Sequence, residues 1–87
     1  MIVAKLVDSI WATRKSEGLQ GIKFMLAEEI GGIYEGRRLI VIDNIGAGIG
    51  DRVIVTTGSA ARRMLGDDNI PVDAAVIGII DQDCDFE

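Results

Sequence analysis

RLIVIDNIGAGIGDRVIVTT, residues 38–57, is the stretch that decides the fold class of this chain. It consists of two runs of aliphatic and β-branched residues, 38–43 and 52–57, on either side of a glycine-rich loop. Such runs favour strands, and the glycines between them favour a turn. Short apolar runs separated by turn residues recur along the chain, so the sequence predicts an all-β fold in one small domain, residues 1–87.

Two further strands are predicted upstream of this stretch. The first lies within the mostly apolar residues 1–13, and the second covers 22–27 after a polar turn. In the first strand, one parity carries Ile2, Ala4, Leu6, Ile10 and Ala12, and the other carries Val3, Val7 and Trp11. Gly31, Gly32 and Gly36 predict a hairpin-like loop before the third strand.

Downstream, the sequence predicts one short helix and a last strand. The helix is expected from Ser59 to Leu65, with Ser59 as its N-cap and Gly66 as its C-terminal stop. The last strand covers 75–80, and residues 81–87 form an acidic tail. Five strands with a short helix before the last one predict a small closed or nearly closed β-barrel.

Several predicted strands are apolar on both faces. Leu39-Ile40-Val41-Ile42 and residues 76–80 show no alternation of apolar and polar side chains. Strands of this kind are covered on both faces. One barrel interior and one short helix offer little cover, so part of the outer strand surface is expected to contact a second subunit. The alternative is that the helix and the loops cover all of it.

Residue counts exclude other sources of stability and several classes of function. A single cysteine, Cys84, allows no internal disulfide, and without histidine no zinc site or other metal or cofactor site is expected. The net charge of −5 and the few aromatic residues argue against nucleic-acid binding. No apolar run approaches the roughly 20 residues of a membrane-spanning helix, and the start lacks a signal-peptide pattern. We therefore expect a cytoplasmic protein.

Two glycine-containing motifs invite a ligand-binding interpretation, and a structural role fits each of them better. The loop 46–50 departs from the G-x-G-x-x-G dinucleotide fingerprint, because the third glycine comes one residue early and a strand follows it. A tight turn, or a loop at the axis of a ring where bulky side chains do not fit, explains this loop. Gly58 and Ser59 could hold an anion at the helix start, yet capping is favoured, and Ser59 has no histidine as a base.

The carboxylates do not form an evident catalytic or metal-binding set. Glu28 and Glu29 would point to opposite faces of a strand, which does not suit a pair that shares a substrate. Asp81, Asp83 and Asp85 lack the glycine and the distal glutamate of a calcium loop. The sequence therefore predicts no catalytic residue.

Five segments in the same order carry a family likeness. They are Ala12-Thr13-Arg14-Lys15, Leu19-x-Gly21-x-Lys23, Ile42-Asp43-x-Ile45-Gly46-Ala47-Gly48-x-Gly50-Asp51, Thr57-Gly58-Ser59-Ala60-Ala61-Arg62 and Pro71-Val72-Asp73-Ala74-Ala75-Val76-Ile77-Gly78-Ile79-Ile80-Asp81. With these segments, which extend over nearly the whole length, the chain resembles the EutN/CcmL family of bacterial microcompartment vertex proteins.

The resemblance implies a five-stranded, OB-like β-barrel that assembles as a pentamer. It implies that the pentamer closes the five-fold vertices of a polyhedral shell around metabolic enzymes, beside hexameric shell proteins, without catalytic activity. The candidate axial-loop residues are Gly46, Ala47, Gly48, Ile49 and Gly50, and the candidate subunit or shell contacts are Arg14, Lys15, Gly58, Ser59, Arg62, Pro71 and Asp73.

Two alternatives from other classes stay open. An OB-like barrel is also typical of modules that bind oligonucleotides or a small ligand, and fold alone does not decide function. A small enzyme that uses a carboxylate pair between subunits would need a polar pocket at the interface, whereas an apolar and tightly packed interface would weaken that interpretation.

Overall fold

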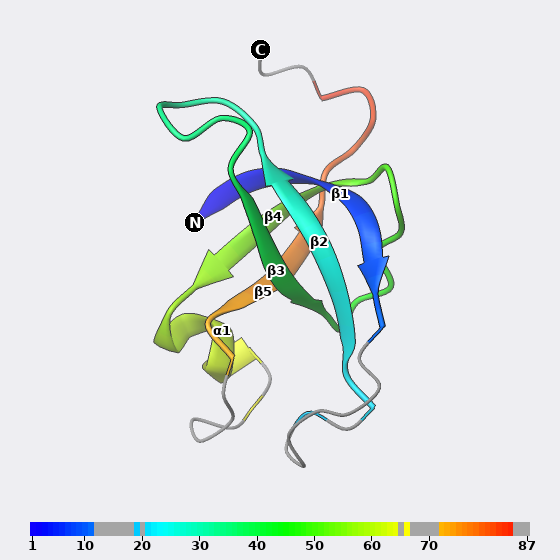
Figure 1. The fold of residues 1–87 in the computed structure, drawn as a ribbon, viewed down its shortest axis with the longest axis vertical. Coiled ribbons are helices and arrows are strands. Elements are labelled where there is room, and N and C mark those ends of the chain that lie inside the picture. Colours follow the sequence, from blue (N-terminus) through cyan, green and yellow to red (C-terminus); the bar gives the residue numbers. More distant parts are fainter. Residues whose placement is uncertain (12–18, 20, 65, 67–71, 85–87) are drawn as a thin grey trace.

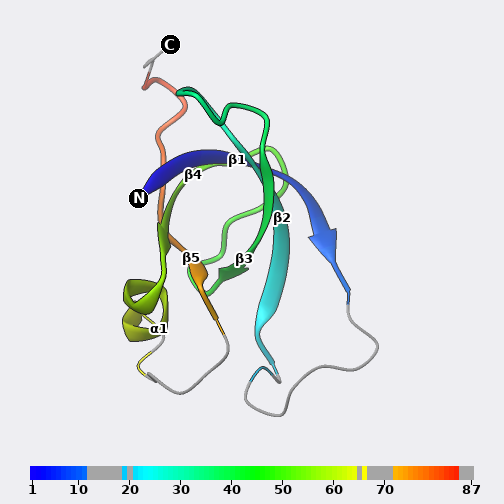
Figure 2. The ribbon, with the colours of Figure 1, turned by 60° about the vertical axis from the view of Figure 1, so that its left-hand side comes forward.

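The structure is a computed structural model and describes residues 1–11, 19, 21–64, 66 and 72–84. Its elements are β1 Ile2–Ile10, β2 Lys23–Glu29, β3 Arg38–Asp43, β4 Arg52–Thr57, α1 Ser59–Met64 and β5 Ala74–Ile79. The strands form a closed barrel in the order β1-β2-β3-β5-β4, and α1 packs beside β4 and β5 (Figure 1, Figure 2). The predicted all-β barrel with one short helix is confirmed.

The bounds of the elements follow the sequence closely. β3 and β4 begin and end at the predicted residues, while β2 and β5 differ by one or two residues at their ends. β2 extends to Glu29 because the Glu29 backbone N–H continues the hairpin pairing and donates to the carbonyl oxygen of Arg37 at 2.8 Å. The candidate residues Arg14, Lys15 and Pro71 lie outside the described residues.

Aliphatic side chains from β1 to β5 fill the barrel interior. The largest fully buried ones are Leu6, Met25, Val41, Val53, Val55 and Val76. They stand at alternating strand positions, as inward-facing residues of a barrel do. Ala47, from the loop between β3 and β4, belongs to the same cluster.

β1 changes face part-way along its length, at a register shift in its pairing with β2. Pairing with β2 is regular up to Leu6 and resumes one residue late with Asp8 opposite Leu26, so Val7 is the extra residue of a β-bulge. A shift of one residue reverses the face of every side chain that follows. Ile10 therefore lies on the outer face while Leu6 points into the core, although the two residues share one parity in the sequence.

α1 covers one part of the outer barrel surface. Ala61 of α1 is fully buried in a second apolar cluster, together with Ile42 of β3 and Ala75 of β5. Leu19 and Val72 complete this cluster. The helix and the neighbouring loop residues thus cover this part of the outer surface from within the subunit.

Of the two predicted caps of α1, the structure confirms the C-terminal one only. The helix begins at Ser59 itself, so Gly58, rather than Ser59, occupies the preceding cap position. Gly66 has a φ of +78°, and its N–H donates to the carbonyl oxygen of Arg63 at 3.0 Å. The predicted C-terminal stop is therefore confirmed. In the part of the chain that the structure describes, no helix has the length and apolarity to cross a membrane.

The hairpin between β2 and β3 projects from the barrel end remote from α1 (Figure 1). At its base, Arg37 Nη2 lies 2.9 Å from Oε1 of the buried Glu29, an ion pair without the alignment of a hydrogen bond. The Arg37 guanidinium also lies 5.0 Å from the centre of the Tyr34 ring, within the range of a cation–π contact. These contacts brace a loop whose tip carries the exposed Ile33.

Residues 81–84 form a turn at the same end of the molecule (Figure 1). The Cys84 N–H donates to the carbonyl oxygen of Asp81, and Arg52 Nη2 donates to the carbonyl oxygens of Asp81 and Gln82 at 3.0 and 3.2 Å. The first part of the predicted acidic tail is thus held against β4, and 85–87 lie outside the described residues.

Candidate functional site

The outer surface of β1, β2 and β3 carries cross-strand rows of side chains, because directly opposed residues share one face of a sheet. Two neighbouring rows are apolar apart from one aspartate. They consist of Ile10, Phe24 and Ile42, and of Asp8, Leu26 and Ile40. We call the five apolar residues of these rows, Ile10, Phe24, Leu26, Ile40 and Ile42, the apolar face.

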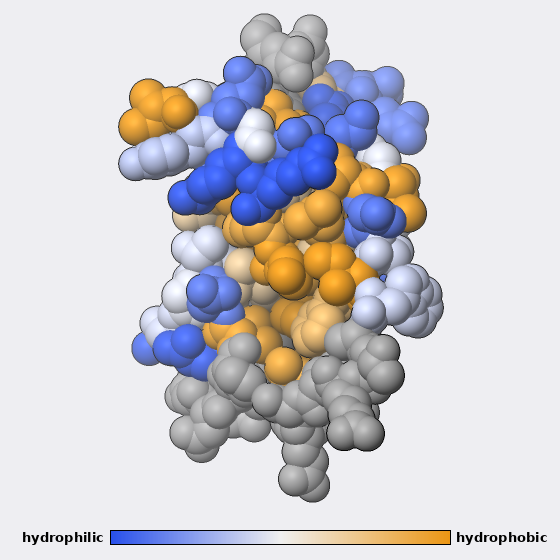
Figure 3. Space-filling view, in the orientation of Figure 1, coloured by the Kyte–Doolittle hydropathy of each residue, from blue (hydrophilic) through white to orange (hydrophobic). Residues whose placement is uncertain are grey.

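A row of charges borders the apolar face on the side of the hairpin. It consists of Lys5, Glu28 and Arg38, which lie opposite one another on β1, β2 and β3. Arg38 Nε lies 3.6 Å from Glu28 Oε1, and both side chains are partly exposed, so this ion pair adds little stability. Figure 3 shows the hydrophilic band above the apolar area. An apolar centre with a polar border is typical of a surface that contacts another protein.

Ile40, 56% exposed, is the least covered member of the apolar face. Two residues further on, Ile42 is buried in the α1 cluster. β3 pairs with β5 at one position only, Ile42 opposite Ala75, and a hollow opens beyond it between Ile40 and the segment that holds Asp73 and Ala74. The chain thus covers part of β3 by itself and leaves Ile40 exposed.

The glycine-rich loop 46–50 is fastened to the barrel by a buried carboxylate. The Asp43 side chain is fully buried, and its Oδ2 accepts a hydrogen bond from Lys23 Nζ at 3.0 Å. Its Oδ1 accepts from the Ile45 N–H at 3.1 Å. Lys23 Nζ donates a second hydrogen bond to the carbonyl oxygen of Ala47, whose side chain is buried in the core. One ion pair therefore joins β2, β3 and the loop.

Backbone hydrogen bonds hold the second half of this loop against β1. The Gly50 N–H donates to the carbonyl oxygen of Leu6 at 2.8 Å, and the Leu6 N–H donates to the carbonyl oxygen of Asp51 at 2.9 Å. Asp51 Oδ2 accepts from the Gly48 N–H at 2.8 Å. The Ala47 side chain is buried, and the glycines of the loop have no side chains. Ile49, which is 63% exposed, is therefore the exposed side chain of the loop.

Two alanine substitutions in this loop should differ in stability. Gly50 has a φ of +92°, and we expect Gly50→Ala to lower the free energy of unfolding by about 1 to 2 kcal/mol, because L residues rarely adopt this conformation. Gly48→Ala is the matched control: its φ is not positive, and an added Cβ would lie 3.9 Å from Asp51 Oδ2, an ordinary contact. Its stability should stay within about 0.5 kcal/mol of the wild type. Urea unfolding measures both, and equal stabilities would contradict the argument.

A second group of candidate residues lies around the start of α1. The Gly58 N–H donates to the carbonyl oxygen of Asp73 at 2.7 Å, and Arg62 Nη1 donates to the carbonyl oxygen of Val72 at 3.2 Å. The structure therefore brings Gly58, Ser59, Arg62 and Asp73 together. It does not bring them to the glycine-rich loop, which lies on the other side of the barrel beside β1 (Figure 1, Figure 2).

The chemistry of the described residues points to contact rather than to a reaction. Within these residues, no group of three or more Cys, Asp or Glu side chains could hold a metal ion. Glu28 lies on the outer face and Glu29 is buried on the inner face, so the predicted separation of these two carboxylates is confirmed. The feature of these residues that suits a contact with another protein is the apolar face.

A barrel of this size whose outer strand surface keeps apolar side chains such as Ile40 exposed is typical of a subunit of a larger assembly. The chain belongs to the family described as ethanolamine utilisation protein EutN/carboxysome, whose model matches residues 1–81. The resemblance that the sequence segments carry is thereby confirmed.

Relatives of known role are similar over most of their length. The bacterial microcompartment shell vertex protein GrpN of Rhodospirillum rubrum (strain F11) is 40% identical over 85 residues, with 93% of both chains covered. The carboxysome shell vertex protein CcmL of Nostoc sp. is 37% identical over 84 residues, which cover 93% of this chain and 83% of the relative.

Solved structures of the same family superpose closely. An ethanolamine utilization protein EutN has a TM-score of 0.88 at 37% identity, with 98% of this chain and 91% of that chain covered. GrpN from Rhodospirillum rubrum, a pentameric microcompartment shell protein, has a TM-score of 0.82 at 36% identity, with 94% and 95% covered. A pentameric shell protein from the RMM microcompartment has a TM-score of 0.86 at 33% identity, with 100% and 98% covered.

Proposed function

We propose that five copies of this chain form a ring that closes the five-fold vertices of a bacterial microcompartment shell. The observation that carries the proposal is the family match over residues 1–81, with relatives named shell vertex proteins and relatives solved as pentamers. The apolar face supports it independently. A head-to-tail ring buries two different patches of each subunit, which suits a barrel with uncovered outer strand surface.

The role of such a ring is geometric. A layer of hexagonal units is flat, and a five-fold unit introduces the curvature that a closed polyhedron requires. The neighbours of the ring are then hexameric shell proteins, and metabolic enzymes lie inside the shell. The chain acts as a structural part of this shell in the bacterial cell.

The proposed role includes no catalytic step and no cofactor. The barrel interior supports this, because fully buried aliphatic side chains such as Leu6 and Val53 fill it. The exposed Ile40 of β3 and the partly exposed Ile10 of β1 would be poor surroundings for polar substrates and good surroundings for another protein. An apolar interface also weakens the alternative of an enzyme with carboxylates between subunits.

Two measurements test the proposed function together. Native mass spectrometry of the purified chain should give a pentamer, and a stable monomer at micromolar concentration would contradict the proposal. Co-expression with hexameric shell proteins should give closed polyhedral particles by electron microscopy. Omitting this chain should give particles with open corners, and closed particles in its absence would contradict the vertex role.

Within the ring, we place the glycine-rich loop 46–50 at the five-fold axis, and disulfide formation tests this. In a Cys84→Ser background, Ile49→Cys should give cross-linked dimers on oxidation, because equivalent side chains of neighbouring subunits meet near an axis. Ser59→Cys, on the other side of the barrel, is the matched control and should not cross-link. Non-reducing electrophoresis measures both, and cross-linking through Ser59→Cys alone would move the axis to the start of α1.

The remaining candidate contacts divide into two groups. Gly58 and Asp73 line the hollow beside Ile40, so we propose them, with the neighbouring Ser59 and Arg62, as part of the subunit contact. Arg14, Lys15 and Pro71 stay predicted contacts with neighbouring subunits or shell proteins.

A further inference from the structure

The second half of β1 has a free edge. β4 pairs with the first half of β1, up to Lys5, and the glycine-rich loop takes over at Leu6 through two main-chain hydrogen bonds. Beyond Leu6, β1 continues to Ile10 with β2 on one side, and among the described residues no strand pairs with its other side. A free edge is a template on which another extended chain can pair.

The main-chain groups of Ser9 point to this free side. The Glu29 N–H donates to the carbonyl oxygen of Arg37, so Glu29 and every second residue before it, including Met25, turn their main-chain groups toward β3. Ser9 lies opposite Met25 and therefore exchanges no main-chain hydrogen bond with it. The N–H and carbonyl groups of Ser9 thus face away from β2, where an added strand would meet them.

Asp8 occupies the donor at this edge. Its Oδ1 accepts a hydrogen bond from the Ser9 N–H at 2.8 Å, and the residue is exposed. The carboxylate therefore stands where the carbonyl oxygen of an added strand would have to bind. The bulge at Val7 distorts the same part of β1. Charged side chains and bulges are two devices by which sheets protect their free edges.

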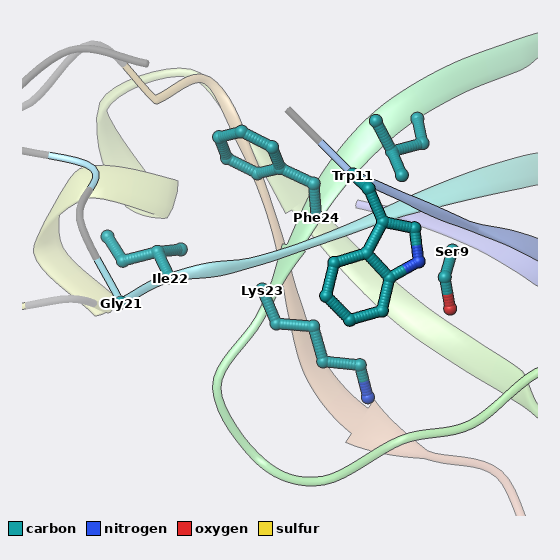
Figure 4. A pocket seen from close by; sticks show the side chains of 7 residues that line it. Ser9, Trp11, Gly21, Ile22, Lys23 and Phe24 are labelled. Atoms are coloured by element: carbon teal, nitrogen blue, oxygen red, sulfur yellow. The ribbon is translucent and has the colours of Figure 1, made fainter. Parts of the chain in front are cut away.

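A neighbouring side chain makes this edge prone to association when it is not protected. Trp11, directly after β1, is 92% exposed, and Figure 4 shows it on the same side of the strands as Ser9 and Lys23. A free edge that carries exposed apolar side chains is a typical site of edge-to-edge aggregation. The end of β1 thus combines unpaired main-chain groups with a large apolar side chain.

We infer that Asp8 protects the free edge of β1 against pairing with other extended chains, because its carboxylate holds the Ser9 N–H and places a negative charge beside it. The inference goes beyond the proposed function, since it concerns an association that a closed ring does not use. Strand pairing at an open edge can continue from chain to chain without closing, whereas a ring has a fixed number of subunits.

Asp8→Ala tests this protection. The variant should form aggregates several-fold faster than the wild type, with the infrared band of intermolecular β-sheet, and circular dichroism should show that it starts folded. Glu28→Ala is the matched control, because it also removes one negative charge, from a position of β2 that is paired on both sides. Light scattering at one protein concentration measures the growth, and equal rates for the two variants would overturn the inference.

A proline distinguishes the edge from the apolar face, because Asp8 also lies in one row with Leu26 and Ile40. Ser9→Pro combined with Asp8→Ala removes the main-chain donor itself, and proline is tolerated at an edge position whose N–H faces away from the sheet. The double variant should aggregate as slowly as the wild type. Aggregation as fast as that of Asp8→Ala would show that the contact uses the apolar face, and would overturn the inference. This comparison does not depend on the number of subunits in the ring, so the proposed function is tested separately.

Discussion

Ile40→Glu is expected to convert the ring into a folded monomer of 9.3 kDa at concentrations where the wild type is a pentamer. Ile40 is 56% exposed in the subunit, so a glutamate there leaves the barrel intact. In the ring, the same carboxylate would be buried against apolar side chains without a partner. Burying an unpaired charge costs at least about 3 kcal/mol, which weakens each subunit contact by roughly 100-fold or more.

The control for this prediction is Ile33→Glu, the same substitution at an exposed isoleucine on the hairpin tip. It should remain pentameric, because Ile33 is not part of the apolar face. Native mass spectrometry reports the assembly state of both variants, and circular dichroism confirms that both are folded. A pentameric Ile40→Glu variant at micromolar concentration would show that the subunits contact one another elsewhere.

Lys23→Met is expected to lower the free energy of unfolding by about 2 to 3 kcal/mol, because it leaves the fully buried Asp43 carboxylate without its cationic partner. The half-exposed position of Lys23 keeps this loss below that of a completely buried pair. For a domain of this size, the melting temperature should fall by roughly 10 to 20 °C. The hydrogen bond from Lys23 to the carbonyl oxygen of Ala47 disappears as well, so the glycine-rich loop should lose its hold on β2.

Two further variants isolate the ion pair from the general effect of removing a lysine. Lys5→Met makes the same change at an exposed position of β1 and should alter stability by less than about 0.5 kcal/mol. Lys23→Met combined with Asp43→Asn should recover part of the loss, because the buried charge is gone and the amide oxygen still accepts from the Ile45 N–H. Thermal unfolding at one protein concentration compares all four proteins. A double variant no more stable than Lys23→Met would show that charge burial is not the cause.

Much of the fold could be predicted because local signals and tertiary structure agree. β3 and β4 begin and end as expected, since each is a six-residue run of strand-forming residues next to a glycine-rich turn. Gly66 ends α1 as expected, because a positive φ is available to glycine without strain. The family segments likewise follow from the order of residues alone, and the family match over residues 1–81 agrees with them.

The site was predictable only in part. The apolar run of β3 indicated a contact with a second subunit. In the structure, the two outward-facing residues of this run differ: Ile42 is buried in the cluster with α1, and Ile40 is exposed. The ion pair between Lys23 and Asp43 was missed, because the two residues are distant in sequence and only the register of β2 with β3 makes them opposite partners. No local spacing could have revealed this pair.

The sequence by itself determined the all-β class, the positions of the central strands, the family, and the surplus of apolar surface, because each depends on residue type and on neighbours along the chain. The tertiary structure alone decided which side chains form that surface. The bulge at Val7 brings Ile10 to the outer face, and strand register aligns it with Phe24 and Ile42. Register is a relation between distant segments, and a shift of one residue reverses every face, so only the assembled barrel defines the surface that a second copy can cover.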